Sequence, residues 1–133
     1  MVNGQSSNSM FLKHLWPALL CALVVFILCV IPGQEFPKIG ILNFDKFVHA
    51  GLFGVLAFLF AKGFYRQTSY PFLNQHYLLI TAIGCSLYGG FLEILQATVC
   101  INRAGDWLDF LFDSIGSVAA VAIVSLKKNF LLG

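Results

Sequence analysis

Four long apolar segments constrain this chain more than any other feature of its sequence. They lie at residues 15–31, 46–64, 77–98 and 106–126. Each is close to the roughly 20 residues that a helix needs to cross about 30 Å of hydrocarbon. Only helices and closed barrels satisfy the backbone hydrogen bonds in lipid, and these segments lack the alternation of barrel strands. The sequence therefore predicts an all-α membrane protein with four transmembrane helices in one bundle.

The composition agrees with a bilayer as the main partner of the chain. Apolar residues make up 59% and charged residues 11% of the sequence, whereas soluble domains have about 25% charged residues. The net charge of +2 comes without a basic stripe, so nucleic acid is not an expected partner. The cysteines have no CxxC spacing, so we expect no disulfide framework, zinc site or other cofactor.

The basic residues predict how the bundle is oriented. One side of the membrane receives only basic charges, from Lys13, Lys62, Arg66, Lys127 and Lys128. Lysine and arginine are enriched in cytoplasmic loops. We therefore expect both termini and the loop at residues 65–76 to be cytoplasmic, in a multi-pass membrane protein. One domain is expected over residues 13–128, after a disordered tail at residues 1–12.

The acidic residues gather at the opposite ends of three segments. The acids there are Asp45, Glu93, Asp106, Asp109 and Asp113. Their spacings of three, four and seven residues place each set on one helix face. Small residues such as Gly89 and Gly116 continue these faces and allow helices to approach closely. The first segment has no such polar residue, so it is expected to pack at the periphery.

We expect these polar side chains to form one cluster near the outer leaflet. Its members would be Asp45, Lys46, His49, Glu93, Gln96, Arg103, Asp106, Asp109 and Asp113. The five acids face two fixed cations, Lys46 and Arg103, which leaves −3 when His49 is neutral. Either some carboxyl groups are protonated or a positively charged ligand binds there.

The order of these motifs resembles the VanZ-like family of small bacterial membrane proteins. The motifs are DK..H, then YGG.LE..Q, then R..D..D...D..G, and they cover about residues 45–120. The matching positions are Asp45, Lys46, His49, Tyr88, Gly89, Glu93, Gln96, Arg103, Asp109 and Gly116. Asp113 stands where the family pattern has Asn, and Asp106 replaces a small hydroxyl residue. The resemblance implies a setting in the bacterial cell envelope, at the inner membrane, because the family is named for a member linked to reduced teicoplanin susceptibility. It implies no particular reaction.

Three functions are compatible with this cluster. The first is a binding site for an envelope ligand, such as a lipid-linked or peptidoglycan-related headgroup, with Tyr88 among its contacts. The second is an accessory structural subunit of an envelope complex, in which the cluster is a network that locks the helices. The third is a membrane-embedded enzyme with His49 and Glu93 as an acid–base pair, in one version with a metal on His49, Glu93 and Asp109 or Asp113.

Overall fold

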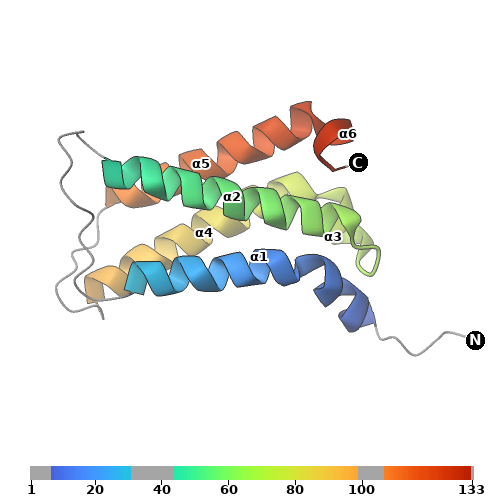
Figure 1. Ribbon diagram of the computed structural model, residues 1–133, viewed down its shortest axis with the longest axis horizontal. Helices are drawn as coiled ribbons and strands as arrows, with labels where there is room; N and C mark the ends of the chain where they lie inside the picture. Colours follow the sequence, from blue (N-terminus) through green and yellow to red (C-terminus); the bar gives the residue numbers. More distant parts are fainter. Residues whose placement is uncertain (1–6, 31–43, 99–106, 133) are drawn as a thin grey trace, which may run out of the picture.

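The described part of the chain is almost entirely helical. The computed structural model describes residues 7–30, 44–98 and 107–132, and this part contains no strand. Its long helices are α1 (Ser7–Val30), α2 (Phe44–Arg66), α4 (Tyr77–Thr98) and α5 (Trp107–Leu126), and its short ones are α3 (Pro71–Gln75) and α6 (Lys128–Leu131) (Figure 1). The 4 long helices are long and apolar enough to cross a membrane. The prediction of an all-α bundle with four membrane-crossing helices is therefore confirmed.

The helix bounds agree closely with the apolar segments, except at the first helix. α4 has the predicted bounds, and α2 and α5 begin and end within two residues of the predicted ones. α1 begins at Ser7, so residues 7–12 of the predicted disordered tail are helical, while residues 1–6 lie outside the described part. Contacts with the loop before α3 stabilise this first turn: Ser69 Oγ donates to the Ser7 carbonyl at 2.9 Å, and Phe11 packs edge-on against Tyr70.

α1 contains a proline, Pro17, and is bent toward its N-terminal end. This proline lies inside the helix, where it cannot donate a hydrogen bond to the preceding turn and its ring crowds that turn. Figure 1 shows the bend toward the N-terminal end of α1. Gly63 of α2 packs against the same region, because a Cβ atom there would lie 2.8 Å from the His14 carbonyl oxygen.

The four long helices pack around small residues and a shared apolar core. The most extensive contact joins α2 and α5, and α1 packs on α2 and α4. At the crossing of α2 and α5, a Cβ atom on Gly116 would overlap the Ala50 carbonyl oxygen. The core cluster between α1, α2 and α4 is formed by Val25, Cys29, Phe53, Leu56, Ala57, Cys85 and Leu92.

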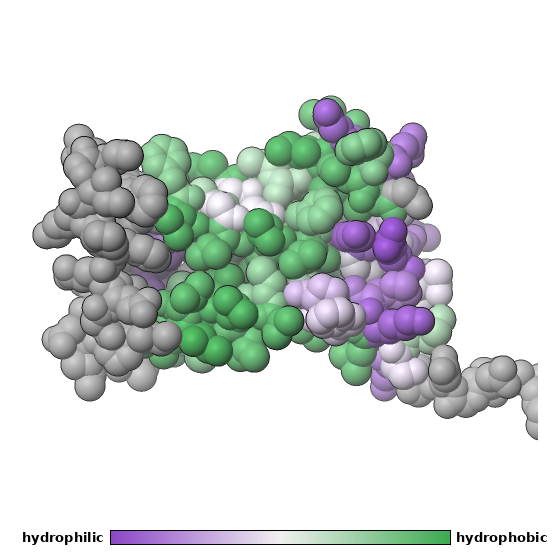
Figure 2. All heavy atoms as spheres, in the orientation of Figure 1, coloured by the Kyte–Doolittle hydropathy of each residue, from purple (hydrophilic) through white to green (hydrophobic). Residues whose placement is uncertain are grey.

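The outer surface of the bundle is apolar, as a lipid-facing surface must be. Figure 2 shows apolar side chains across the middle of the molecule and hydrophilic ones at the end near α3 and α6. Large side chains such as Leu23, Leu87 and Ile94 are more than half exposed. They cost little in this position because hydrocarbon, not water, would surround them.

The segment at residues 65–76, which the sequence predicted to be a loop, contains the short helix α3 and is held by side-chain hydrogen bonds. Gln67 is fully buried, and its amide nitrogen donates to the carbonyls of Phe64 and Tyr70 at 3.2 and 2.9 Å. Its amide oxygen accepts from the Tyr70 backbone N–H at 2.8 Å. Lys128 lies 4.8 Å above the ring of Tyr65, so α6 also packs against this end.

Candidate functional site

The acidic end of the bundle brings polar side chains from three helices together. Lys46 and His49 lie one turn apart at the start of α2, and Asp109 and Asp113 lie one turn apart at the start of α5. Glu93 comes from the last part of α4, which runs antiparallel to both. The two helix starts and the helix end meet because α2, α4 and α5 cross the bundle in alternating directions. We call these five residues the polar cluster.

Two close contacts join α2 to α5 within the polar cluster. Lys46 Nζ donates to Asp109 Oδ1 at 3.3 Å, and the Lys46 and Asp109 side chains are 8% and 13% exposed. His49 Nδ1 lies 2.9 Å from Asp113 Oδ1, and the Asp113 side chain is only 1% exposed. The other ring nitrogen, Nε2, lies 3.8 Å from Asp109 Oδ2. Burial of this degree makes each contact sensitive to the loss of one partner.

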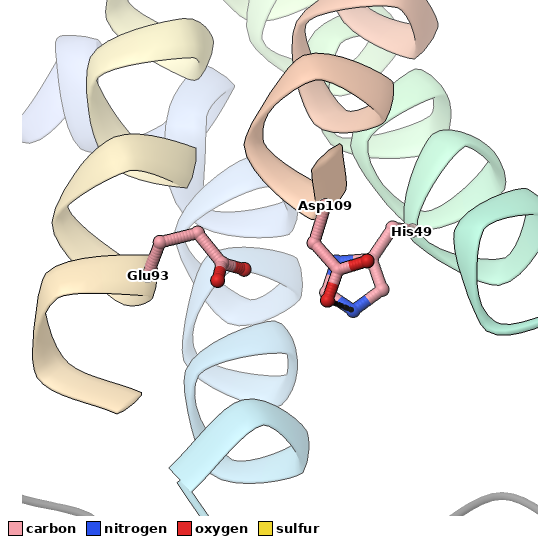
Figure 3. A group of neighbouring side chains, drawn as sticks. All are labelled: His49, Glu93 and Asp109. Carbon is pink, nitrogen blue, oxygen red and sulfur yellow. Dashed lines mark ion pairs between the residues drawn. The ribbon is translucent and has the colours of Figure 1, made fainter. Parts of the chain in front are cut away.

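α4 contributes a carboxylate and the space that Asp113 occupies. Glu93 is buried and points toward His49 and Asp109 (Figure 3). One turn deeper, a Cβ atom on Gly89 would lie 2.9 Å from Asp113 Oδ2 and 3.0 Å from its Cβ. Glycine at this position therefore lets α5 bring Asp113 against the backbone of α4. Within α5, the Ser117 hydroxyl donates to the backbone carbonyl of Asp113 at 2.8 Å.

Two predicted site residues, Gln96 of the cluster and Tyr88 as a ligand contact, form hydrogen bonds to α1 instead. The Tyr88 hydroxyl donates to the Ala22 carbonyl at 2.7 Å, and Gln96 Nε2 donates to the Cys29 carbonyl at 2.9 Å. These bonds attach α4 to α1, so α1 is more than the apolar packing helix that its sequence predicted. The side-chain pattern could not reveal this, because the acceptors on α1 are backbone carbonyl groups.

Three predicted members of the cluster are not part of the described geometry. Arg103 and Asp106 lie outside the described residues, and of Asp45 only the helical backbone is described. Their place in the cluster remains a prediction.

An apolar cavity of about 240 Å³ lies between α1, α2 and α4, outside the polar cluster. Its lining includes Ala22, Phe60, Thr81, Gly84 and Tyr88. Thr81 Oγ1 is buried there and has no hydrogen-bond partner within the described part of the chain. No sequence pattern predicted this cavity, because it depends on how three helices are rotated about their axes.

The sequence matches one known protein family over most of its length. The family model VanZ/LLP1 matches residues 4–128, which is nearly the whole chain. The chain belongs to the VanZ/LLP1 family. The resemblance found in the motifs is thus confirmed, and it extends over α1, which the motifs did not cover. The comparisons with curated proteins and with solved structures gave no match.

The polar cluster gives this VanZ-family chain groups suited to binding or to proton transfer. It contains an imidazole, three carboxyl groups and an ammonium group. Ser114, which follows Asp113 in α5, donates a hydrogen bond from its hydroxyl to the Phe110 carbonyl at 3.0 Å. The described contacts of Ser114 therefore provide no activating base for nucleophilic catalysis.

Proposed function

We propose that the polar cluster binds the headgroup of a lipid-linked envelope ligand in the outer leaflet of the bacterial inner membrane. The ligand would carry both an anionic group, such as a phosphate, and an ammonium group. The observation that carries this proposal is the burial of both signs of charge at one end of the bundle. Lys46 offers a cation, and Glu93 and Asp109 offer anions, at the same end of three helices.

The energetic cost of this arrangement supports a function. Charged side chains inside a membrane protein are rare because insertion is costly, up to roughly 2.5–3.5 kcal/mol for a charge at the helix centre and less toward the helix ends where this cluster lies. α2, α4 and α5 carry charged residues at the same end of the bundle, although most of the sequence is uncharged. A headgroup with two opposite charges would match this mixed cluster.

A helix-locking network is the second candidate, and a specific observation favours it. Lys46 and His49 already contact Asp109 and Asp113, so α2 and α5 are joined without a ligand. In that case the chain would act as a structural subunit of an envelope complex, and the cluster would determine which helices pack together.

Binding to lipids of defined headgroup should separate the two candidates. We expect phosphatidylethanolamine, which carries a phosphate and an ammonium group, to raise the Tm of the detergent-purified protein in the presence of EDTA. Uncharged diacylglycerol should not. The double variant Lys46→Gln/Asp109→Asn removes both charges of one pair and should remain folded but lose the lipid-dependent increase in Tm. Lys62→Gln, at the basic end, is the control and should keep the increase.

Two other outcomes would contradict headgroup binding or favour the network. If phosphatidylethanolamine has no effect on the parent protein, headgroup binding is wrong. If, in addition, the double variant unfolds at a much lower temperature, the cluster acts as a network.

Cysteine labelling should test the proposed orientation. On intact spheroplasts that produce a Cys100→Ser background, we expect Gly40→Cys and Asn102→Cys to react with a membrane-impermeant thiol reagent. Thr68→Cys and Asn129→Cys should react only after the membrane is permeabilised. The reason is that Lys62, Arg66, Lys127 and Lys128 lie at the same end of the bundle as residues 68 and 129. The reverse labelling pattern would place the polar cluster on the cytoplasmic side.

A further inference from the structure

His49, Glu93 and Asp109 have a mutual arrangement that is typical of metal ligands. Each offers one ligand atom, and these three atoms all lie within 4.8 Å of one another. The residues come from α2, α4 and α5, and Figure 3 shows their side chains directed toward a common space. Ligands that surround one divalent ion at about 2.0–2.2 Å lie a little over 3 Å apart, so small side-chain rotations would complete such a set.

Asp113 orients His49 in the way that a metal site requires. Histidines that bind metals almost always donate their other ring N–H to a carboxylate or carbonyl group. Here Nδ1 lies 2.9 Å from the almost fully buried Asp113 Oδ1. When Nδ1 carries the proton, Nε2 presents its lone pair to Asp109 and Glu93. This contact is independent of the three ligand atoms, because Asp113 is not one of them.

The approach of His49 Nε2 to Asp109 Oδ2 is favourable only if a positive charge lies between the two atoms. Nε2 and Asp109 Oδ2 are 3.8 Å apart, which is too long for a direct hydrogen bond. A lone pair and a carboxylate oxygen that face each other repel unless a proton or a cation lies between them. A further carboxylate oxygen, Asp113 Oδ2, lies nearby. It is buried without a hydrogen-bond partner among the described residues and faces Gly89 of α4. The five residues of the polar cluster carry a net −2 when His49 is neutral and the carboxyl groups are ionised, because Lys46 balances one of the three acids.

We propose that His49 Nε2, Glu93 and Asp109 Oδ2 bind one divalent transition-metal ion, with Asp113 as the positioning residue of His49. One imidazole with two carboxylates suits Mn²⁺, Fe²⁺ or Zn²⁺ better than Ca²⁺ or Mg²⁺, which prefer oxygen ligands alone. Lys46 contacts Oδ1 of Asp109 and so leaves Oδ2 to the metal. Three protein ligands leave coordination positions for water or an anionic group. This site shares Glu93 and Asp109 with the headgroup site proposed above, so the metal ion and the ammonium group are alternative occupants, and metal binding does not depend on headgroup binding.

Binding of Mn²⁺ alone to the purified full chain tests the proposal. The protein is treated with a chelator, desalted in detergent without added lipid, and titrated with Mn²⁺ while electron paramagnetic resonance measures the free ion. We expect about one bound ion per chain and a ¹⁴N coupling from the His49 imidazole in pulsed spectra. Excess Zn²⁺ should displace the Mn²⁺.

Matched variants assign the ligands. His49→Ala should abolish the ¹⁴N coupling, and Glu93→Gln should raise the Kd for Mn²⁺ at least tenfold, whereas His76→Ala, which changes an exposed histidine, should alter neither. Asp113→Asn should keep the coupling and raise the Kd by about 10–100-fold, the usual effect of a change beside a metal-bound histidine. Glu93→Gln preserves side-chain size, so the test does not depend on His49→Ala being folded.

Two outcomes would overturn the site. The first is an absence of Mn²⁺ binding at millimolar concentration. The second is binding without a ¹⁴N coupling, or binding that Glu93→Gln leaves unchanged. Neither outcome bears on headgroup binding, because that experiment is carried out with EDTA present.

Discussion

Replacing Gly116 with alanine should destabilise the protein more than any other Gly→Ala change in the acidic half of the bundle. The new Cβ atom would overlap the Ala50 carbonyl oxygen and would lie 2.8 Å from the Ala50 carbonyl carbon and Cα. All three obstacles are backbone atoms, so no side-chain rotation relieves the overlap and α2 and α5 must separate. Overpacking typically costs about 1–3 kcal/mol, and we expect the upper end of this range or more. The measurement is the free energy of unfolding in mixed detergent micelles.

Two other substitutions make the Gly116 result specific. Gly51→Ala introduces the same methyl group one residue from Ala50, but nothing lies within 4 Å of it. It should leave stability unchanged or raise it, by up to about 1 kcal/mol from better helix propensity. Ala50→Gly should not rescue Gly116→Ala, because the obstacle is the Ala50 backbone and not its side chain. Equal stabilities for Gly116→Ala and Gly51→Ala would show that α2 and α5 do not approach this closely.

Replacing Lys46 with methionine should be the most damaging single change in the polar cluster. The ammonium group lies 3.3 Å from Asp109 Oδ1, and the two side chains are about nine-tenths buried. Removal of one partner from a buried ion pair costs about 3–5 kcal/mol, because the remaining charge loses its compensation. The free energy of unfolding of Lys46→Met should fall by an amount in this range.

A double-mutant cycle should show that this loss comes from the Asp109 charge. Adding Asp109→Asn to Lys46→Met removes the uncompensated carboxylate and should recover part of the lost stability, with a coupling of about 0.5–3 kcal/mol. Lys62→Met is the control, since this lysine lies at the basic end near Phe58, and it should change stability by about 0.5 kcal/mol or less. If the effects of Lys46→Met and Asp109→Asn are simply additive, the two side chains do not interact.

Much of the fold could be predicted from hydrophobicity and length alone. A helix in lipid must satisfy its own backbone, so a long apolar segment has one available structure, and α4 accordingly begins at Tyr77 and ends at Thr98 as predicted. α1 departed from this rule at its start, because residues 7–12 are held by contacts with the loop that contains Ser69 and Tyr70. Such contacts depend on a segment more than fifty residues away and leave no local pattern.

Helical spacing also predicted which polar residues share a face, but not which partners they meet. The spacing of Asp109 and Asp113 places both on one side of α5, yet it does not show which residues of α2 they contact. Close packing decided this. Gly116 brings α5 against Ala50 of α2, and that contact sets the register in which Lys46 reaches Asp109 and His49 reaches Asp113.

The sequence by itself therefore determined the number of membrane-crossing helices, the faces that carry their polar residues and the VanZ/LLP1 relationship. These properties depend on side chains of one segment at a time, or on their order along the chain. The tertiary structure alone decided that Tyr88 and Gln96 bond to α1, that Lys46 contacts Asp109 and that His49 contacts Asp113. The physical reason is that such contacts depend on the rotation of each helix about its axis. That rotation is set by close backbone approach and by carbonyl acceptors, which every residue possesses and no sequence pattern marks.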